Sequence, residues 1–293
     1  DRLEEAVRKD PALADLTNEK GERAIELACL ECRRAMQKAL FLLGRYDVDK
    51  TPPLHFSATA AVLSATDYDA DPKQRRALKA MRRADQVVAE LRGRAGLNDD
   101  YVVAVKAVHV GSTVGDDAFA EVESAATELG LVIDKNADLG GLSGLLAQRS
   151  RGDDVTKARD AAGTGRFEGY DYLIVLELAD MSLNHAIVHG GIAGRDFHEV
   201  RGIADDIVKA LSHLHEERRI HADVKPLNIV RVGLSWQLID LNVSCAIGCE
   251  FGAKRPSSGY CPPEMARVIV DATDAKGTLD ATKLQAFMRA VRG

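Results

Sequence analysis

The sequence lacks an apolar run long enough to cross a membrane as a helix. Its longest apolar runs are "YLIVLELA" at 172–179 and "ALFLLG" at 39–44, whereas a spanning helix needs about 20 residues. It also lacks a long basic stretch, and its formal net charge is −6. We therefore expect neither a membrane protein nor a nucleic-acid-binding protein. The opening "DRLEEAVRKD" is charged throughout, which argues against a signal peptide.

Cysteine is scarce and odd in number, with five in the chain. An odd count favours reduced thiols, so we expect an intracellular, cytoplasmic setting. Cys29 and Cys32 form a C-x-x-C pair, but no second such pair completes a zinc site. Cys245 and Cys249 have no histidine nearby. We therefore do not expect these cysteines to bind metal.

The remaining composition is that of an ordinary globular protein, with 46% apolar and 29% charged residues in 293. This length suits two domains or one two-lobed domain. The first residue is Asp1 and not Met, from which we expect a fragment of a longer protein. Residues 1–44 have apolar spacing typical of helices. Within them, "NEKGERAIELAC" resembles the turn and first helix of an ankyrin repeat, and a generic helical cap is the alternative.

Residues 45–180 alternate between strand and helix patterns. We expect strands between 46 and 71 and at "RRALKAM", a helix at 82–94, and strands at "DYVVAVKAVHV" and "YDYLIVLEL". The interval 111–169 is rich in Gly, Asp and Ala, with one helical portion near 117–129, and predicts a partly disordered surface insertion. A long amphipathic helix follows, with an apolar stripe of Val200, Ile203, Ile207 and Leu211.

The stretch "RIHADVKPLNIVR" carries the most specific chemical signal. His221, Asp223, Lys225 and Asn228 have the spacing H-x-D-x-K-x-x-N of a protein-kinase catalytic loop. In that chemistry Asp223 accepts the proton of the substrate hydroxyl, and Lys225 neutralises charge on the transferred phosphoryl group. Asn228 holds a magnesium ion, and His221 packs the loop. A polar turn without catalytic role is the structural alternative.

Further segments follow in the order that a kinase requires. Asp240 ends the apolar strand of "WQLIDLNVS", where a kinase keeps its second metal-binding residue, and "SSGYCPPE" ends at Glu264 like the close of an activation segment. The chain thus resembles a serine/threonine protein kinase, and over 46–264 it resembles the ankyrin-repeat-fused kinases of oomycetes and related algae. The resemblance makes Leu176 the gatekeeper and brings the backbone of Glu177 to Ala179 to the adenine of ATP.

Two lysines compete for the role of phosphate anchor. Lys106 lies in "VAVK", the phrase typical of that lysine, and would need Glu121 as its partner. Lys79 is followed by Glu90 within the next helix, which is the order that the lysine–glutamate ion pair requires. With Lys106 as anchor, a further strand would be needed within 130–170, an interval poor in strand-forming residues. We therefore predict that Lys79 and Glu90 bind the nucleotide and that Lys106 does not.

Several positions depart from the kinase pattern. The glycine-rich loop is replaced by "DKTPPLHFSATAAV", so phosphate contact would depend on backbone amides around Ser57 to Ala60. "DLN" replaces the usual "DFG", and Ala222 replaces the arginine that receives a phosphorylated activation loop. Only 29 residues follow Glu264 (293 − 264), so we expect an incomplete C-lobe.

The predicted fold is α+β and two-lobed, like a protein kinase: a β-rich N-lobe with its hinge at 45–180, and an incomplete helical C-lobe at 181–293. An ankyrin-like segment precedes them at 1–44. The predicted function is ATP- and magnesium-dependent phosphorylation of serine or threonine in a protein substrate. Asn228 and Asp240 are the predicted metal ligands, and the ankyrin-like segment is a candidate site for a protein partner. The alternatives are a pseudokinase scaffold and an ankyrin-type interaction module.

Overall fold

A computed structural model describes residues 2–57, 59–150, 167–248 and 258–273, with the single residues 280 and 282. The chain divides into two compact units. The first unit is Asp1–Ala84, Val105–Glu123 and Leu131–Leu178, and the second unit is Asp85–Ala104, Ser124–Gly130 and Ala179–Gly293. In the described ranges no helix is long and apolar enough to span a membrane.

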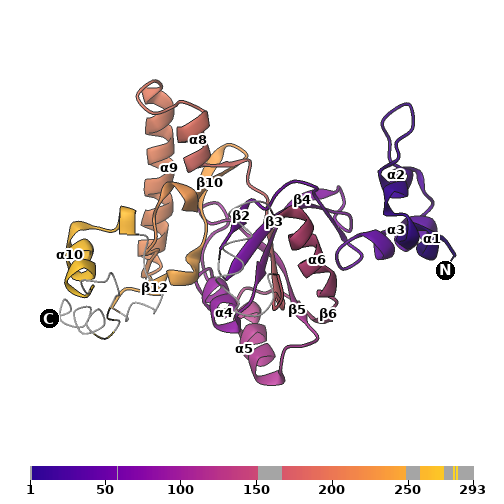
Figure 1. The fold of residues 1–293 in the computed structure, drawn as a ribbon. Coiled ribbons are helices and arrows are strands. Elements are labelled where there is room, and N and C mark those ends of the chain that lie inside the picture. The colour runs from indigo at the N-terminus through magenta and orange to yellow at the C-terminus, as the bar shows by residue number, and fades with distance from the viewer. Residues whose placement is uncertain are drawn as a thin grey trace. The chain divides into compact units, whose positions relative to one another are not determined.

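The first unit is built on one sheet with the strand order β1-β3-β4-β7-β5-β6, and β2 pairs with β3 (Figure 1). Its strands are β1 (Tyr46–Val48), β2 (His55–Phe56), β3 (Ala60–Asp67), β4 (Gln74–Met81), β5 (Val105–Gly111), β6 (Ile133–Ala137) and β7 (Tyr172–Glu177). The expected strands around 46–71, at "RRALKAM", at "DYVVAVKAVHV" and at "YDYLIVLEL" are therefore confirmed.

The centre of this sheet is formed by β4, which pairs antiparallel with β3 on one side and with β7 on the other. Leu78 and Ala80 of β4 belong to the buried apolar cluster of the first unit. Because side chains alternate along a strand, Lys79 lies on the opposite face of the sheet from Leu78. Each fully buried leucine contributes about 1.5–3 kcal/mol of burial free energy, which fixes the register of this strand and hence the face on which Lys79 lies.

The interval 111–169 differs from the expected surface insertion. It forms α5 (Asp116–Thr127), β6, and α6 (Gly140–Arg149), and β6 pairs in parallel with β5. Leu142 and Leu146 of α6 are fully buried in the same apolar cluster as Leu78. The expectation of a surface insertion is thus wrong for residues 131–150, which complete the sheet and its core. Residues 151–166 lie outside the described residues.

Composition concealed this core contribution. Gly140, Gly141 and Gly144 dilute the helical pattern of α6, although Leu142 and Leu146 keep the i,i+4 spacing of a buried helical face. The strand β6, "IDKNA", contains one β-branched residue and is held by its pairing with β5. The argument that 130–170 could supply no strand was therefore wrong.

The N-terminal helices α1 (Arg2–Lys9), α2 (Ala24–Leu27) and α3 (Leu30–Leu40) confirm the helical prediction for 1–44. They enclose a small apolar cluster of Val7, Ile25, Met36 and Phe41. Ala28 and Cys29 are extended and separate α2 from α3. The helices alone do not establish an ankyrin repeat.

The second unit contains four described helices, three short 3-10 turns and two small sheets. The helices are α4 (Ala84–Arg92), α8 (Leu183–His189), α9 (Phe197–Glu216) and α10 (Pro263–Asp271). The strands are β8 (Met181–Ser182), β9 (Arg219–Ile220), β10 (Ile229–Val232), β11 (Ser235–Leu238) and β12 (Cys245–Ala246). The 3-10 turns are η2 (Pro226–Asn228), η3 (Leu241–Val243) and η4 (Ser258–Tyr260).

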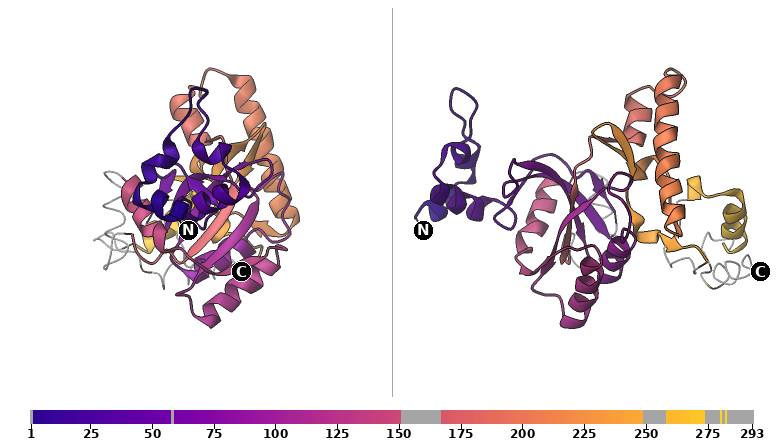
Figure 2. Two further views of the ribbon diagram at one scale, coloured as in Figure 1. Left: turned by 90° about the vertical axis from the view of Figure 1, so that its right-hand side faces the viewer. Right: turned by 180° about the vertical axis from the view of Figure 1, so that it is seen from behind.

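The long helix α9 organises the apolar core of the second unit, with α8 beside it (Figures 1 and 2). Its N-terminus is capped by Asp196, whose carboxylate accepts a hydrogen bond from the Glu199 N–H at 2.8 Å. Ile203 and Leu214 are buried against the β10–β11 hairpin residues Trp236 and Leu238. Val200, expected in the apolar stripe, is instead exposed. The chain leaves α9 through β9 and enters the segment that carries the kinase-like pattern.

Candidate active site

The segment 221–228 lies between two short pieces of sheet in the second unit. Before it, Ile220 of β9 pairs with Cys245 of β12. After it, β10 forms a hairpin with β11, and the Ile239 N–H donates to the Asn228 carbonyl at 3.0 Å. These backbone contacts hold residues 221–228 next to residues 239–246. The motif residues are thus positioned by the scaffold on both sides of the segment.

Asp223, Lys225 and Asn228 converge on one carboxylate. The Lys225 ammonium lies 2.7 Å from Asp223 Oδ2, and Asn228 Nδ2 donates to the same oxygen at 3.0 Å. Asn228 Nδ2 also donates to the Asp223 backbone carbonyl at 2.8 Å. Asp223 and Asn228 are buried. A carboxylate with charged and neutral donors fixed around it keeps its orientation, which a proton-accepting group needs.

His221 is a neutral imidazole that holds the backbone at Asp223 in place. Its Nδ1 accepts the Asp223 N–H at 3.2 Å, so Nε2 carries the proton and donates to the Ile239 carbonyl at 3.1 Å. Burial lowers the pKa of His221 below its ordinary value, with the hydrogen bond to Ile239 opposing this shift. The ring thus ties the start of the 221–228 segment to the strand end before Asp240, as expected of a packing residue.

Two non-glycine residues of the site have left-handed backbone conformations. Ala222 has φ +68° and Asp240 has φ +63°. A side chain with Cβ pays about 1 kcal/mol or more for such a conformation, and strain of this kind is concentrated at functional sites. Ala222 directly precedes Asp223, and Asp240 is itself a predicted metal ligand. The backbone is therefore strained directly before Asp223 and at Asp240.

The donor set of this segment fits a magnesium ion. Asn228 Nδ2 is the donor in both of these contacts with Asp223, so Oδ1 is the amide atom that can coordinate a cation. Asp240 supplies a carboxylate, and Mg²⁺ is usually held by one or two carboxylate-type ligands with substrate phosphates and water. In the described part of the chain no group of three His, Cys, Asp or Glu side chains could hold a metal by itself. Substrate phosphates and water would supply the remaining magnesium ligands.

The helix α4 contributes Glu90, which is 0% exposed, and a residue that the sequence reasoning missed. Arg94, two residues past the end of α4, is 4% exposed and places Nη1 2.5 Å from Glu90 Oε1. The i,i+4 spacing of Glu90 and Arg94 was a readable signal for an ion pair. It was not used because Glu90 had been assigned to Lys79.

In the first unit, the two candidate lysines occupy different environments. Lys79 is 8% exposed in the central strand β4. The Lys106 side chain is 37% exposed and lies 3.7 Å from the Glu177 carboxylate. Glu121, the partner that Lys106 would need, is exposed on α5. Lys106 thus makes an exposed ion pair, whereas Lys79 has the desolvated environment expected of a phosphate anchor.

The turn proposed for phosphate contact uses its polar groups internally. The Ser57 N–H and Oγ–H donate to the Ala60 carbonyl at 2.9 and 3.1 Å, and the Ala60 N–H donates to Ser57 Oγ at 3.2 Å. Residue 58 lies outside the described residues. A phosphate would have to displace these bonds, so this turn offers fewer ready donors than the sequence suggested.

The predicted adenine-binding stretch lies at the end of β7. Leu176 is buried, and Glu177 is the last residue of the strand, opposite Arg76 of β4. Ala179 is partly buried and lies beyond the strand, in the second unit. Glu177 and Ala179 remain predicted adenine contacts through their backbone atoms.

The part of the chain that matches a known protein family includes the 221–228 segment. Residues 147–278 match the protein kinase domain. This kinase-like segment includes Glu177, Ala179, Asp223, Lys225, Asn228 and Asp240, whereas Ser57, Lys79 and Glu90 precede it. The sheet of the first unit and the helices of the second are consistent with the expected α+β kinase-like fold.

Curated relatives are serine/threonine kinases. The chain is 32% identical over 93 residues to the serine/threonine-protein kinase Kist of Rattus norvegicus, which is 31% of this chain and 22% of the relative. It is 31% identical over 93 residues to the serine/threonine-protein kinase Kist of Homo sapiens, which again is 31% of this chain and 22% of the relative. It is 32% identical over 85 residues to the serine/threonine-protein kinase fused of Drosophila melanogaster, covering 29% of this chain and 9% of the relative. The chain thus spans less than a quarter of the relatives that it matches.

Proposed function

We propose that this protein transfers the γ-phosphoryl group of ATP to serine or threonine hydroxyls of a protein substrate. The observation that carries the proposal is the buried convergence of Lys225 and Asn228 on the Asp223 carboxylate, within the kinase-like segment. Phosphoryl transfer needs little covalent chemistry from the protein, so catalysis depends on positioned charges of this kind. Lys225 after the aspartate is typical of serine/threonine kinases.

Each residue has a distinct role in the proposed reaction. Asp223 orients the acceptor hydroxyl and takes its proton, and Lys225 stabilises negative charge that develops on the transferred group. Asn228 and Asp240 would hold magnesium, which neutralises charge on the nucleotide phosphates when bound. Lys79, Glu90 and Ser57 are the residues proposed to bind the nucleotide phosphates. The backbone at Glu177 and Ala179 receives the adenine.

A pseudokinase scaffold is the second candidate. The internally bonded Ser57 turn favours it, because phosphates would meet fewer free amides there. The intact set of Asp223, Asn228 and Asp240 favours catalysis. The ankyrin-like resemblance of residues 1–44 makes this segment a proposed docking site for a protein partner. We also propose an intracellular location, because the odd number of cysteines, five, favours reduced thiols.

An active kinase and a pseudokinase are distinguished by measuring phosphoryl transfer and ATP binding on the same sample. The 293-residue chain, supplied with γ-labelled ATP, magnesium and a mixture of serine- and threonine-containing peptides, is expected to label the peptides, and removal of magnesium by a chelator should abolish labelling. Tight ATP binding without any labelling, in the presence of magnesium, would instead establish the pseudokinase. Lys106→Met serves as a matched surface control and should label peptides at nearly the rate of the unmodified chain.

A further inference from the structure

The ion pair between Glu90 and Arg94 is buried to an unusual degree for two charged groups. Its Nη1–Oε1 distance is 2.5 Å. Arg94 Nη1 also lies 3.2 Å from the Glu90 carbonyl, and Nε donates to the Val103 carbonyl at 3.2 Å. The guanidinium is therefore fixed by one carboxylate and two backbone carbonyls.

The end of α4 also packs closely against the segment that follows Asp240. A Cβ on Gly93 would come within 2.6 Å of the Leu241 carbonyl oxygen and 2.9 Å of Leu241 Cβ. Only glycine allows this approach of the two backbones. Arg94 is moreover among the charges that lower the pKa of His221, after burial as the main cause. Within the second unit, the end of α4 is thus packed against Leu241, and the charge of Arg94 acts on His221.

Stability alone does not account for this pair. Replacing a buried ion pair by apolar residues of similar volume is often neutral or stabilising, because both charges lose their hydration. Arg94 Nη2 is buried without a hydrogen-bond partner among the described residues, which adds to the cost. An apolar pair would hold α4 with less penalty. The charges therefore require a reason other than packing.

We propose that Arg94 is a positioning residue that holds the Glu90 carboxylate in the orientation that its role in nucleotide binding requires. This inference rests on the proposed function. An arginine stays protonated at every physiological pH, so Glu90 keeps a counter-charge whether or not nucleotide is present. A carboxylate has two oxygens and about four lone-pair positions, so Glu90 can keep its contact with Arg94 and accept a further donor.

The test compares Arg94→Met, Arg94→Lys and the apolar double variant Glu90→Leu/Arg94→Met in the 293-residue chain. The measured quantities are KM for ATP, KM for the acceptor peptide, kcat and the unfolding temperature. Arg94→Met is expected to raise KM for ATP by about tenfold or more and to leave KM for the peptide unchanged. Arg94→Lys should recover part of this loss because it keeps the charge. The double variant should unfold near the wild-type temperature and still show the raised KM for ATP.

A purely structural arginine would give a different pattern. It would lower kcat through a smaller folded fraction, and KM for ATP would not change. Arg92→Met is the matched control, because Arg92 lies on the same helix in an exposed ion pair with Glu128 at 3.4 Å. If Arg94→Met keeps the wild-type KM for ATP, the inference is overturned and the proposed phosphoryl transfer stands. If the double variant keeps it, the inference is overturned together with the proposed role of Glu90. If the unmodified chain neither binds nor uses ATP, both fall.

Discussion

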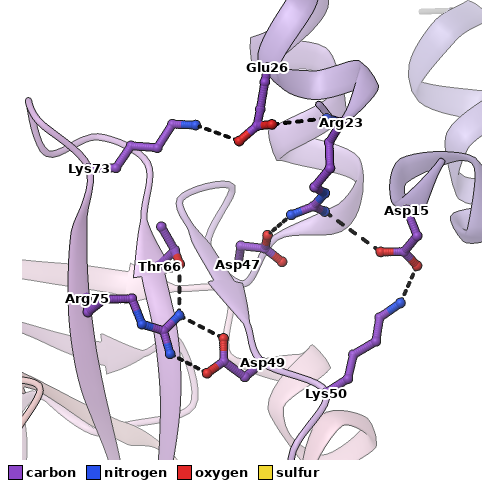
Figure 3. A network of polar contacts seen from close by, with 9 residues as sticks. All are labelled: Asp15, Arg23, Glu26, Asp47, Asp49, Lys50, Thr66, Lys73 and Arg75. Atoms are coloured by element: carbon purple, nitrogen blue, oxygen red, sulfur yellow. Dashed lines mark hydrogen bonds and ion pairs between the residues drawn. The ribbon is translucent and has the colours of Figure 1, made fainter. Parts of the chain in front are cut away.

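Two polar networks of this protein differ in how deeply their side chains are buried. In the second unit, His221, Asp223 and Asn228 are 1%, 6% and 5% exposed and share hydrogen bonds within one short segment. In the first unit, a larger network lies at the surface between the N-terminal helices and the sheet (Figure 3), with the members Asp15, Arg23, Glu26, Asp47, Asp49, Lys50, Thr66, Lys73 and Arg75.

The number of contacts does not decide which of the two networks contributes more to stability and activity. Exposed ion pairs contribute about 0–1 kcal/mol each, because water competes for both charges. A buried polar group that loses its partner costs about 1–3 kcal/mol, and more if it is charged. The smaller buried network is therefore expected to matter more for both activity and stability. The following substitutions test that difference, from the largest expected effect to the smallest.

Loss of the Asp240 charge should have the largest effect. Asp240→Asn keeps a side chain that tolerates the left-handed backbone at φ +63°, so it isolates the charge. One preorganised charge contact is worth about 3–4 kcal/mol in the transition state, so turnover should fall by several hundredfold. Steady-state kinetics with magnesium measure this. Asp205→Asn is the control, because Asp205 forms an exposed pair with Lys209 at 2.6 Å. Full magnesium-dependent turnover in Asp240→Asn would remove Asp240 from the metal site.

The two lysines of the first unit give the next largest contrast. Lys79→Met should reduce turnover by about a hundredfold or more, because it removes a desolvated charge. Lys106→Met should change turnover by less than about fivefold, because Lys106 lies in an exposed pair with Glu177. Both variants can be measured in one assay. The reverse order of the two effects would show that Lys106 is the anchor.

The free energy of unfolding of two variants, one in each network, tests the same comparison without any assumption about function. Asn228→Ala removes a donor from the buried Asp223 carboxylate and should lower the free energy of unfolding by about 1–3 kcal/mol. Arg75→Met removes an exposed guanidinium that donates to Asp49 at 2.8 Å, and should cost less than about 1 kcal/mol. Urea unfolding of both variants measures the difference. Equal losses would mean that burial does not separate the two networks.

The pH dependence of stability should be a smaller, gradual effect. The pKa of His221 is lowered in the folded state by burial, and that of His109 is lowered for the same reason. As pH falls, these histidines therefore take up protons in the unfolded chain before they do so in the folded protein. Their contribution to the free energy of unfolding is complete above about pH 6.5 and is lost as pH falls towards the folded-state pKa values. His221→Gln should flatten this decline between pH 7 and 5, and the exposed His198→Gln should not. A decline of the same steepness in His221→Gln would show that His221 does not contribute to it.

The catalytic segment could be predicted from sequence because its contacts are local. Asn228 reaches Asp223 over five residues and Lys225 over two, so residue spacing nearly determines their geometry. The pairing of β6 with β5 and the burial of Leu142 could not be predicted in this way. They depend on distant partners, and a glycine-rich composition conceals them.

Errors at the site had a different origin from errors in the fold. The Glu90–Arg94 pair was visible in the spacing, but one role had already been assigned to Glu90. The internal hydrogen bonds of the Ser57 turn could not be inferred from the sequence. A serine hydroxyl can form a hydrogen bond to the backbone of its own turn as readily as to a ligand. Spacing thus indicated which residues meet, and the structure was needed to show which polar groups were already engaged.

The central claim is that the buried carboxylate of Asp223 serves phosphoryl transfer. Single-turnover transfer from γ-labelled ATP to a serine peptide tests it directly, with Asp223→Asn compared with the unmodified chain and ATP binding measured in parallel. The account predicts that Asp223→Asn binds ATP with nearly unchanged affinity and transfers the phosphoryl group at least about a hundredfold more slowly, which is the low end for a general base. Equal transfer rates in the two proteins, with ATP bound to both, would contradict it.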